Sequence, residues 1–86
     1  MIEFTYLKVA DLNGITYDTV ESDARFIRKY FKKFAENARF KVRELSYYQC
    51  FRLEVKRTNS RKLALEAFKA AYEQDKAESS IYHEDD

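Results

Sequence analysis

The chain has no proline or tryptophan, one glycine and one cysteine among its 86 residues. The single glycine, Gly14, leaves no room for a glycine-rich phosphate loop or a flexible linker. Cys50 cannot form a disulfide within the chain, and no cysteine or histidine stands at metal-ligand spacing from it. This cysteine usage favours a reducing compartment, so the cytoplasm is the expected location.

Catalytic and metal-binding residue types are equally scarce. The only histidine is His83, near the end of the chain, whereas a catalytic triad needs a histidine held rigidly beside its nucleophile. Asp18, Glu21 and Asp23 place three acids in six residues, but no glycine-containing loop shapes them into a Mg²⁺ or Ca²⁺ site. Cys50 as a nucleophile would need a stabilised thiolate, and an inert structural role is the favoured interpretation. We therefore expect no enzyme activity, no metal and no cofactor.

Long apolar runs are missing as well. No run approaches the roughly 20 residues that span a bilayer, and the residues after Met1 show no basic segment followed by an apolar stretch. Membrane insertion and secretion are therefore not expected. A hydrophobic fraction of 45% with seven Phe and seven Tyr indicates a folded chain. The length fits one domain, expected over residues 1–78, with an acidic and flexible tail over 79–86.

The first half of the sequence predicts a hairpin followed by a helix. Residues 2–10 and 15–20 are rich in β-branched and aromatic residues and flank Asn13-Gly14, a pair that favours a tight hairpin turn. Over residues 22–38 apolar side chains recur every three or four positions, which predicts an amphipathic helix.

The second half repeats the same order. Residues 40–47 and 50–58 predict two strands, the second because Phe51, Leu53 and Val55 alternate with charged residues. A second helix is expected over residues 61–76. The predicted fold is therefore an α+β two-layer sandwich with a four-stranded antiparallel sheet and two helices on one face. Its order is ββαββα, with βαββα as the alternative.

Charge is distributed unevenly along the chain. The net charge is +1, yet the stretch from Ala24 to Lys69 contains fourteen lysines and arginines against four acids. Most of the acids lie in residues 1–23 and 70–86. A basic centre of this kind is typical of a chain that binds nucleic acid or an acidic protein surface.

The first candidate site is one face of the helix predicted over residues 22–38. Five cations fall on the side opposite its apolar stripe, namely Arg25, Arg28, Lys29, Lys32 and Lys33. Like charges four residues apart repel on a helix, and a bound polyanion would neutralise them. A merely solvated face is the alternative.

The second candidate site lies on the predicted strands. Arg52 and Lys56 share the outward phase of residues 50–58, and Tyr47 and Tyr48 are expected at the turn before that strand. Exposed tyrosines at such a turn can stack on nucleobases, although packing of one ring against the core edge is an equal alternative.

Three functional hypotheses follow from these patterns. The first is a small non-catalytic accessory or regulatory protein that binds nucleic acid, RNA ahead of DNA, through the basic helix face. The alternative is a protein-interaction module, such as an inhibitor or adaptor that docks on an acidic partner or a nucleic-acid enzyme. A compact chain without proline would suit a phage or mobile-element product of that kind. The third is self-association, as a homo-oligomer, through an unpaired sheet edge.

Overall fold

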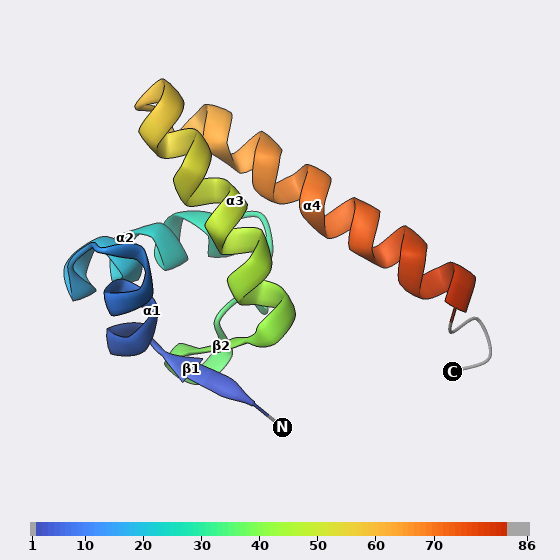
Figure 1. Ribbon diagram of the computed structural model, residues 1–86, viewed down its shortest axis with the longest axis horizontal. Helices are drawn as coiled ribbons and strands as arrows, with labels where there is room; N and C mark the ends of the chain where they lie inside the picture. Colours follow the sequence, from blue (N-terminus) through green and yellow to red (C-terminus); the bar gives the residue numbers. More distant parts are fainter. Residues whose placement is uncertain (1, 83–86) are drawn as a thin grey trace.

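The computed structural model describes residues 2–82 and is mostly helical (Figure 1). Its elements are β1 (Glu3–Thr5), α1 (Tyr6–Asn13), α2 (Tyr17–Arg28), the 3-10 helix η1 (Glu36–Ala38), β2 (Arg39–Lys41), α3 (Val42–Thr58) and α4 (Arg61–Tyr82). Helices α1 and α2 form one side of the molecule, and α3 and α4 form a helical hairpin against the other (Figure 1). Helix α4 extends beyond the remaining elements in the same view.

The predicted four-stranded sandwich is wrong, in both the ββαββα and the βαββα order. Within the described residues the only sheet has two strands, β1 and β2, which are antiparallel and pair over three residues each. Phe4 lies opposite Phe40 at the centre of this register. All four predicted strands are therefore wholly or mostly helical.

The Asn13-Gly14 pair ends a helix instead of turning a hairpin. Thr5 caps the start of α1, where its hydroxyl accepts a hydrogen bond from the Lys8 amide at 3.2 Å. Gly14 has φ 63°, and its amide donates back to carbonyls of the last turn. A left-handed glycine after the last helical residue is a common helix stop, which the hairpin interpretation overlooked.

The helix expected over residues 22–38 is shifted towards the N-terminus. Thr16 caps α2 by accepting a hydrogen bond from the Thr19 amide at 3.2 Å, and the helix ends at Arg28. Beyond it Ala35 has φ 53° and Asn37 has φ 59°, which a right-handed helix cannot include. Residues 29–35 instead form an irregular turn.

Helix α3 replaces the third and fourth predicted strands. Tyr47, Tyr48 and Phe51 are buried at helical spacing, whereas Leu53 is 67% exposed. The alternation of apolar residues from Phe51 to Val55 was therefore misleading, because Leu53 does not share the buried face. Helix α3 ends at Thr58, and the residue that caps it, Asn59, has φ 55°.

Helix α4 confirms the start of the second predicted helix. Ser60 accepts a hydrogen bond from the Leu63 amide at 3.2 Å, and Ala64 and Phe68 lie in the core, with Ala71 and Tyr72 partly buried beside them. The helix continues through residues 79–82. His83 and the rest of the predicted tail, 83–86, lie outside the described residues.

Aromatic rings fill the core between the two sides of the molecule. The Phe40 ring lies 5.0 Å from that of Phe34, 5.2 Å from Tyr48 and 5.7 Å from Tyr6, measured between centroids. Edge-to-face contacts of this kind add to the stabilisation from apolar burial. This core fixes the turn that follows α2 against α3 and α4.

Candidate functional site

The five cations predicted on one helix face are divided between a helix and a turn. Arg25 and Arg28 lie in α2, Lys29 follows its last residue, and Lys32 and Lys33 belong to the irregular turn. We call residues 29–35 the lysine turn. The single basic helix face therefore does not exist, although three exposed lysines remain close together along the turn.

Arg28 is part of the internal structure of the turn. Its Nη1 donates to the hydroxyl of Tyr6 at 3.0 Å and to the backbone carbonyls of Phe34 and Ala35 at 3.4 and 3.5 Å. The guanidinium thus holds the far end of the lysine turn against α1. Arg25 is different, because it forms only an exposed ion pair with Glu21 at 3.7 Å, which is worth little.

Tyr48 and Arg52 from the second candidate site are engaged in a buried carboxylate network. Asp23 is fully buried, and its Oδ2 accepts from the Tyr48 hydroxyl at 2.6 Å and from Arg52 Nη1 at 2.9 Å. Arg61 Nε donates to Oδ1 at 2.8 Å. Burial, together with the hydrogen bond to Asp23, holds the pKa of the Tyr48 hydroxyl far above its usual range. The network joins α2, α3 and α4.

Tyr47 is also buried. The prediction of an exposed tyrosine pair at a turn is therefore wrong. Both tyrosines lie within α3 because residues 42–58 are helical. The Tyr47 hydroxyl donates to Asp75 of α4, and Arg43 Nε lies 3.7 Å from the same carboxylate. Burial first, and then the hydrogen bond to Asp75, raise the pKa of Tyr47 well beyond its ordinary value. Lys56 is the one residue of this second site that is exposed and forms no ion pair with the described residues.

Arginines and lysines have separate roles in this fold. Every arginine except Arg39 forms an ion pair or a side-chain hydrogen bond within residues 2–82. Every lysine, in contrast, is exposed and forms no ion pair there. Arginine forms oriented hydrogen bonds that suit buried pairs, whereas lysine is a hydrated point charge. The cations available to a ligand are therefore the lysines, together with the exposed arginines Arg25, Arg39, Arg43 and Arg57.

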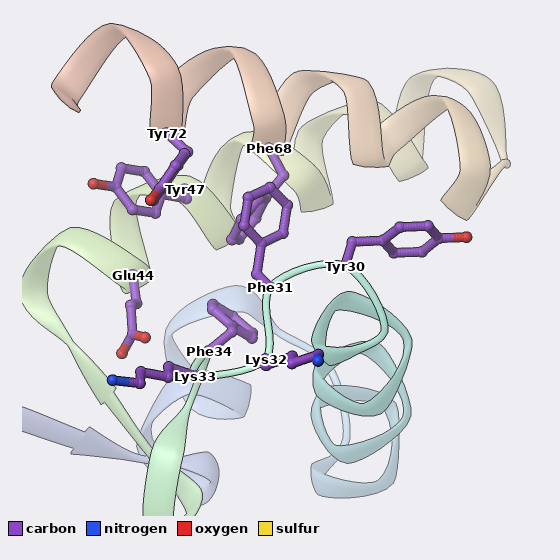
Figure 2. Close-up of a pocket in the computed structure, with 9 residues that line it drawn as sticks. All are labelled: Tyr30, Phe31, Lys32, Lys33, Phe34, Glu44, Tyr47, Phe68 and Tyr72. Carbon is purple, nitrogen blue, oxygen red and sulfur yellow. The ribbon is translucent and has the colours of Figure 1, made fainter. Parts of the chain in front are cut away.

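A groove of about 380 Å³, lined mainly by aromatic rings, opens beside the lysine turn, between the turn, α3 and α4 (Figure 2). We call it the aromatic groove. Its walls include rings from all three segments, and the Phe31 ring lies 4.9 Å from Phe68 and 5.1 Å from Tyr72 between centroids. Tyr47 and Tyr72 face the groove from one side in Figure 2, and their rings are 5.8 Å apart.

Two lysines and one acid line the aromatic groove. Lys32 and Lys33 are exposed on the lysine turn. Glu44, in the first turn of α3, accepts from the Lys41 amide through Oε1 at 2.8 Å and from the Ala35 amide through Oε2 at 3.2 Å. Both carboxylate oxygens are therefore bound to the backbone, which fixes the lysine turn to α3. Sequence reasoning missed this role, although an acid at the start of a helix is a recognised capping signal.

Three exposed apolar side chains lie on α1 and at the start of α2. Leu7 is 68% exposed, and Leu12 and Tyr17 are about half exposed. A shallow hollow next to them is lined by Leu7, Ile15 and Tyr17 among others. Exposed apolar surface of this kind is a feature of interaction sites.

The described part of the chain shows neither a metal-binding cluster nor a membrane-spanning helix. Between residues 2 and 82, no group of three or more histidine, cysteine, aspartate or glutamate side chains gathers as metal ligands. Over the same range, no helix combines the length and the apolar character needed to cross a membrane.

Comparisons with protein-family models, with curated proteins and with solved structures found no match. Function is therefore inferred from the geometry of this chain alone.

Proposed function

We propose that this protein binds single-stranded nucleic acid, RNA in preference to DNA, without catalysing a reaction. The observation that supports the proposal most strongly is the lysine turn. Lys29, Lys32 and Lys33 are exposed within five residues and form no ion pair in the described chain, and Lys32 and Lys33 line the aromatic groove. Cations beside aromatic rings are the combination that proteins use to hold single strands.

Charge supports a polyanionic ligand. Three like charges on one short turn repel one another, and phosphate groups would relieve that repulsion while releasing the counterions of the strand. Arg28 is held inside the turn by Tyr6 and two backbone carbonyls, so the three lysines supply the turn's contacts, which are strong at low salt and weak at high salt. Lysine contacts to phosphate give affinity without reading sequence. We therefore propose binding with little sequence preference.

Single strands are favoured over duplexes because of the shape of the site. The groove is lined by rings, and an unpaired base offers a ring face that a base pair inside a duplex does not. The lysines stand on an irregular turn and not on a projecting helix, which is the usual element for reading a major groove. The cytoplasm is the proposed location, on the basis of the single free cysteine, Cys50.

The alternative, a protein-interaction module such as an inhibitor or adaptor, is supported by a different observation. The exposed apolar residues of α1 and the start of α2, Leu7, Leu12 and Tyr17, would suit a protein partner or a second copy of the chain. This surface lies away from the lysine turn, so the two functions involve different residues.

The proposal is tested by fluorescence anisotropy with labelled single-stranded RNA, single-stranded DNA and duplex DNA of one length over a range of salt concentrations. We expect the affinity to decrease in that order and to fall as salt rises, with a slope of log affinity against log salt of about −2 for three phosphate contacts. Salt-independent binding, or equal affinity for duplex and single strands, would contradict the proposal.

A further inference from the structure

We propose, resting on the function above, that the aromatic groove receives one unpaired nucleobase of the bound strand, while Lys32 and Lys33 contact the phosphates on either side of it. The groove is then a base site and not only a surface next to the cations.

The size and walls of the groove fit such a ligand. At about 380 Å³, its volume lies at the lower end of the range of roughly 300 to 1,000 Å³ for small-molecule sites. Phe31 and Tyr72 are only partly buried, so each ring presents part of its surface to the groove. Tyr47 and Phe68 are buried behind them. A planar ring placed here would stack on an aromatic wall that the core already holds in position.

The charges around the groove favour a base within a strand over a purely apolar ligand. Lys32 and Lys33 line the groove, and the acid among the lining residues, Glu44, has both oxygens bound to backbone amides. A nucleobase is neutral and its flanking phosphates are anionic. An apolar floor with cations at its edge therefore matches the ligand in both respects.

A second hollow adjoins the aromatic groove, which favours a strand over a free nucleotide. On the other side of Phe31, this hollow is lined by Tyr30, Phe31, Leu65, Glu66 and Lys69. Tyr30, which also lines the aromatic groove, is 60% exposed, and in Figure 2 its ring lies on the opposite side of Phe31 from Tyr47 and Tyr72. Lys69 supplies one cation to this hollow, and Glu66 supplies one acid. A strand that places one base in the groove would pass over this second hollow with its next nucleotides.

The experiment compares ligands that share phosphates but differ in bases. The probes are a short oligouridine, an abasic ribose-phosphate strand of the same length, uridine monophosphate, and polyglutamate. Loss of stacking on one base corresponds to roughly 5- to 100-fold in affinity. We expect oligouridine to bind more tightly than the abasic strand by about that factor, with the same salt slope for both.

Two variants locate the effect. Tyr72→Leu keeps an apolar side chain but removes the ring, and we expect it to lower oligouridine affinity to that of the abasic strand, whose own affinity stays unchanged. Tyr17→Leu, at the start of α2, is the matched control and should leave both affinities as in the parent. Because Tyr72 also packs on Phe31, folding is checked by melting. Independently, the aromatic proton resonances of Phe31 and Tyr72 in the unaltered protein should shift with oligouridine and not with the abasic strand.

The outcomes separate the two proposals. Equal affinity for oligouridine and the abasic strand would overturn the base site and leave the nucleic-acid function intact. If neither strand binds, the proposed function itself fails. Binding of uridine monophosphate as tight as that of the strand would replace the strand with a free nucleotide, and equally tight binding of polyglutamate would replace it with an acidic protein.

Discussion

Tyr48 of α3 donates its hydroxyl hydrogen to Asp23 of α2 across the core, with 2.6 Å between the two oxygens and both side chains fully buried. Arg52 and Arg61 complete the environment of the carboxylate. A buried charge is tolerated only when it is paired and hydrogen-bonded. This arrangement therefore fixes how α2 packs on the α3–α4 hairpin.

Removal of the carboxylate charge should destabilise the fold strongly. Asp23→Asn leaves Arg52, whose side chain is 13% exposed, without its charge partner, and the loss of one member of a buried pair costs about 3 to 5 kcal/mol. Urea denaturation of the variant should show this decrease. Asp18→Asn, an exposed acid in the first turn of the same helix, is the control and should cost at most about 1 kcal/mol. Equal midpoints would contradict the network.

Stability should decrease in alkali because of the buried tyrosine. The pKa of Tyr48 is raised above its usual 10.0 by burial and by the bond to Asp23. Above pH 10 the unfolded chain releases this proton while the folded chain retains it. The stabilisation is therefore complete below pH 10 and is lost as pH rises further, by about 1.4 kcal/mol per pH unit for one proton.

Tyr48→Phe removes this ionisable group and so isolates its contribution. Measured by urea denaturation at successive pH values, the variant should lose less stability per pH unit above pH 10 than the parent does. Tyr47, whose pKa is raised in the same direction, leaves a residual slope in the variant. Identical slopes in the two proteins would show that Tyr48 does not stay protonated in the folded state.

Arg28 should stabilise the fold, whereas Arg25 should not. Arg28→Gln removes the donor to Tyr6 and to the carbonyls of the lysine turn, at a cost of about 1 to 3 kcal/mol. Arg25→Gln breaks only an exposed pair and should change stability by less than about 0.5 kcal/mol. Thermal melting of the two single variants compares them directly. A larger loss for Arg25→Gln would contradict the assigned geometry.

The helical state of residues 50–58 can be tested with two apolar positions. In a strand Phe51 and Leu53 would share one face and matter alike. In α3 only Phe51 is buried, so Phe51→Ala should cost about 3 to 5 kcal/mol, and Leu53→Ala should stay within about 0.5 kcal/mol. Similar losses at both positions in chemical denaturation would favour the strand.

Some of the helices were predictable from the sequence, and others were mistaken for strands. The start of α4 and its apolar stripe follow from a serine cap and helical periodicity, which are local signals. The hairpin failed because Asn13-Gly14 serves equally well as a helix stop. The strand predicted over 50–58 is wrong because the alternation was seen in only three residues, Phe51, Leu53 and Val55. Such a short alternation also occurs in a helix, and the other buried residues of α3, Tyr47 and Tyr48, precede residue 50.

The candidate site was predictable only in part. Lys29, Lys32 and Lys33 were identified from charge alone, and their exposure agrees with the use that we propose for them. The roles of Arg28 and Arg52 depend on partners 22 and 29 residues away in sequence, and no local pattern reveals them. The aromatic groove combines the lysine turn, α3 and α4, so it appears only when these segments are packed together.

The most direct test of the central claim is the salt dependence of single-stranded RNA binding in a triple variant, Lys29→Gln, Lys32→Gln and Lys33→Gln. Its control is the triple variant Lys8→Gln, Lys56→Gln and Lys62→Gln, which removes the same charge from exposed lysines outside the turn. We predict that only the first variant loses about 2 units of the slope of log affinity against log salt, while both melt like the parent. Unchanged binding in the first variant, or an equal loss in the control, would contradict the lysine turn as the binding site.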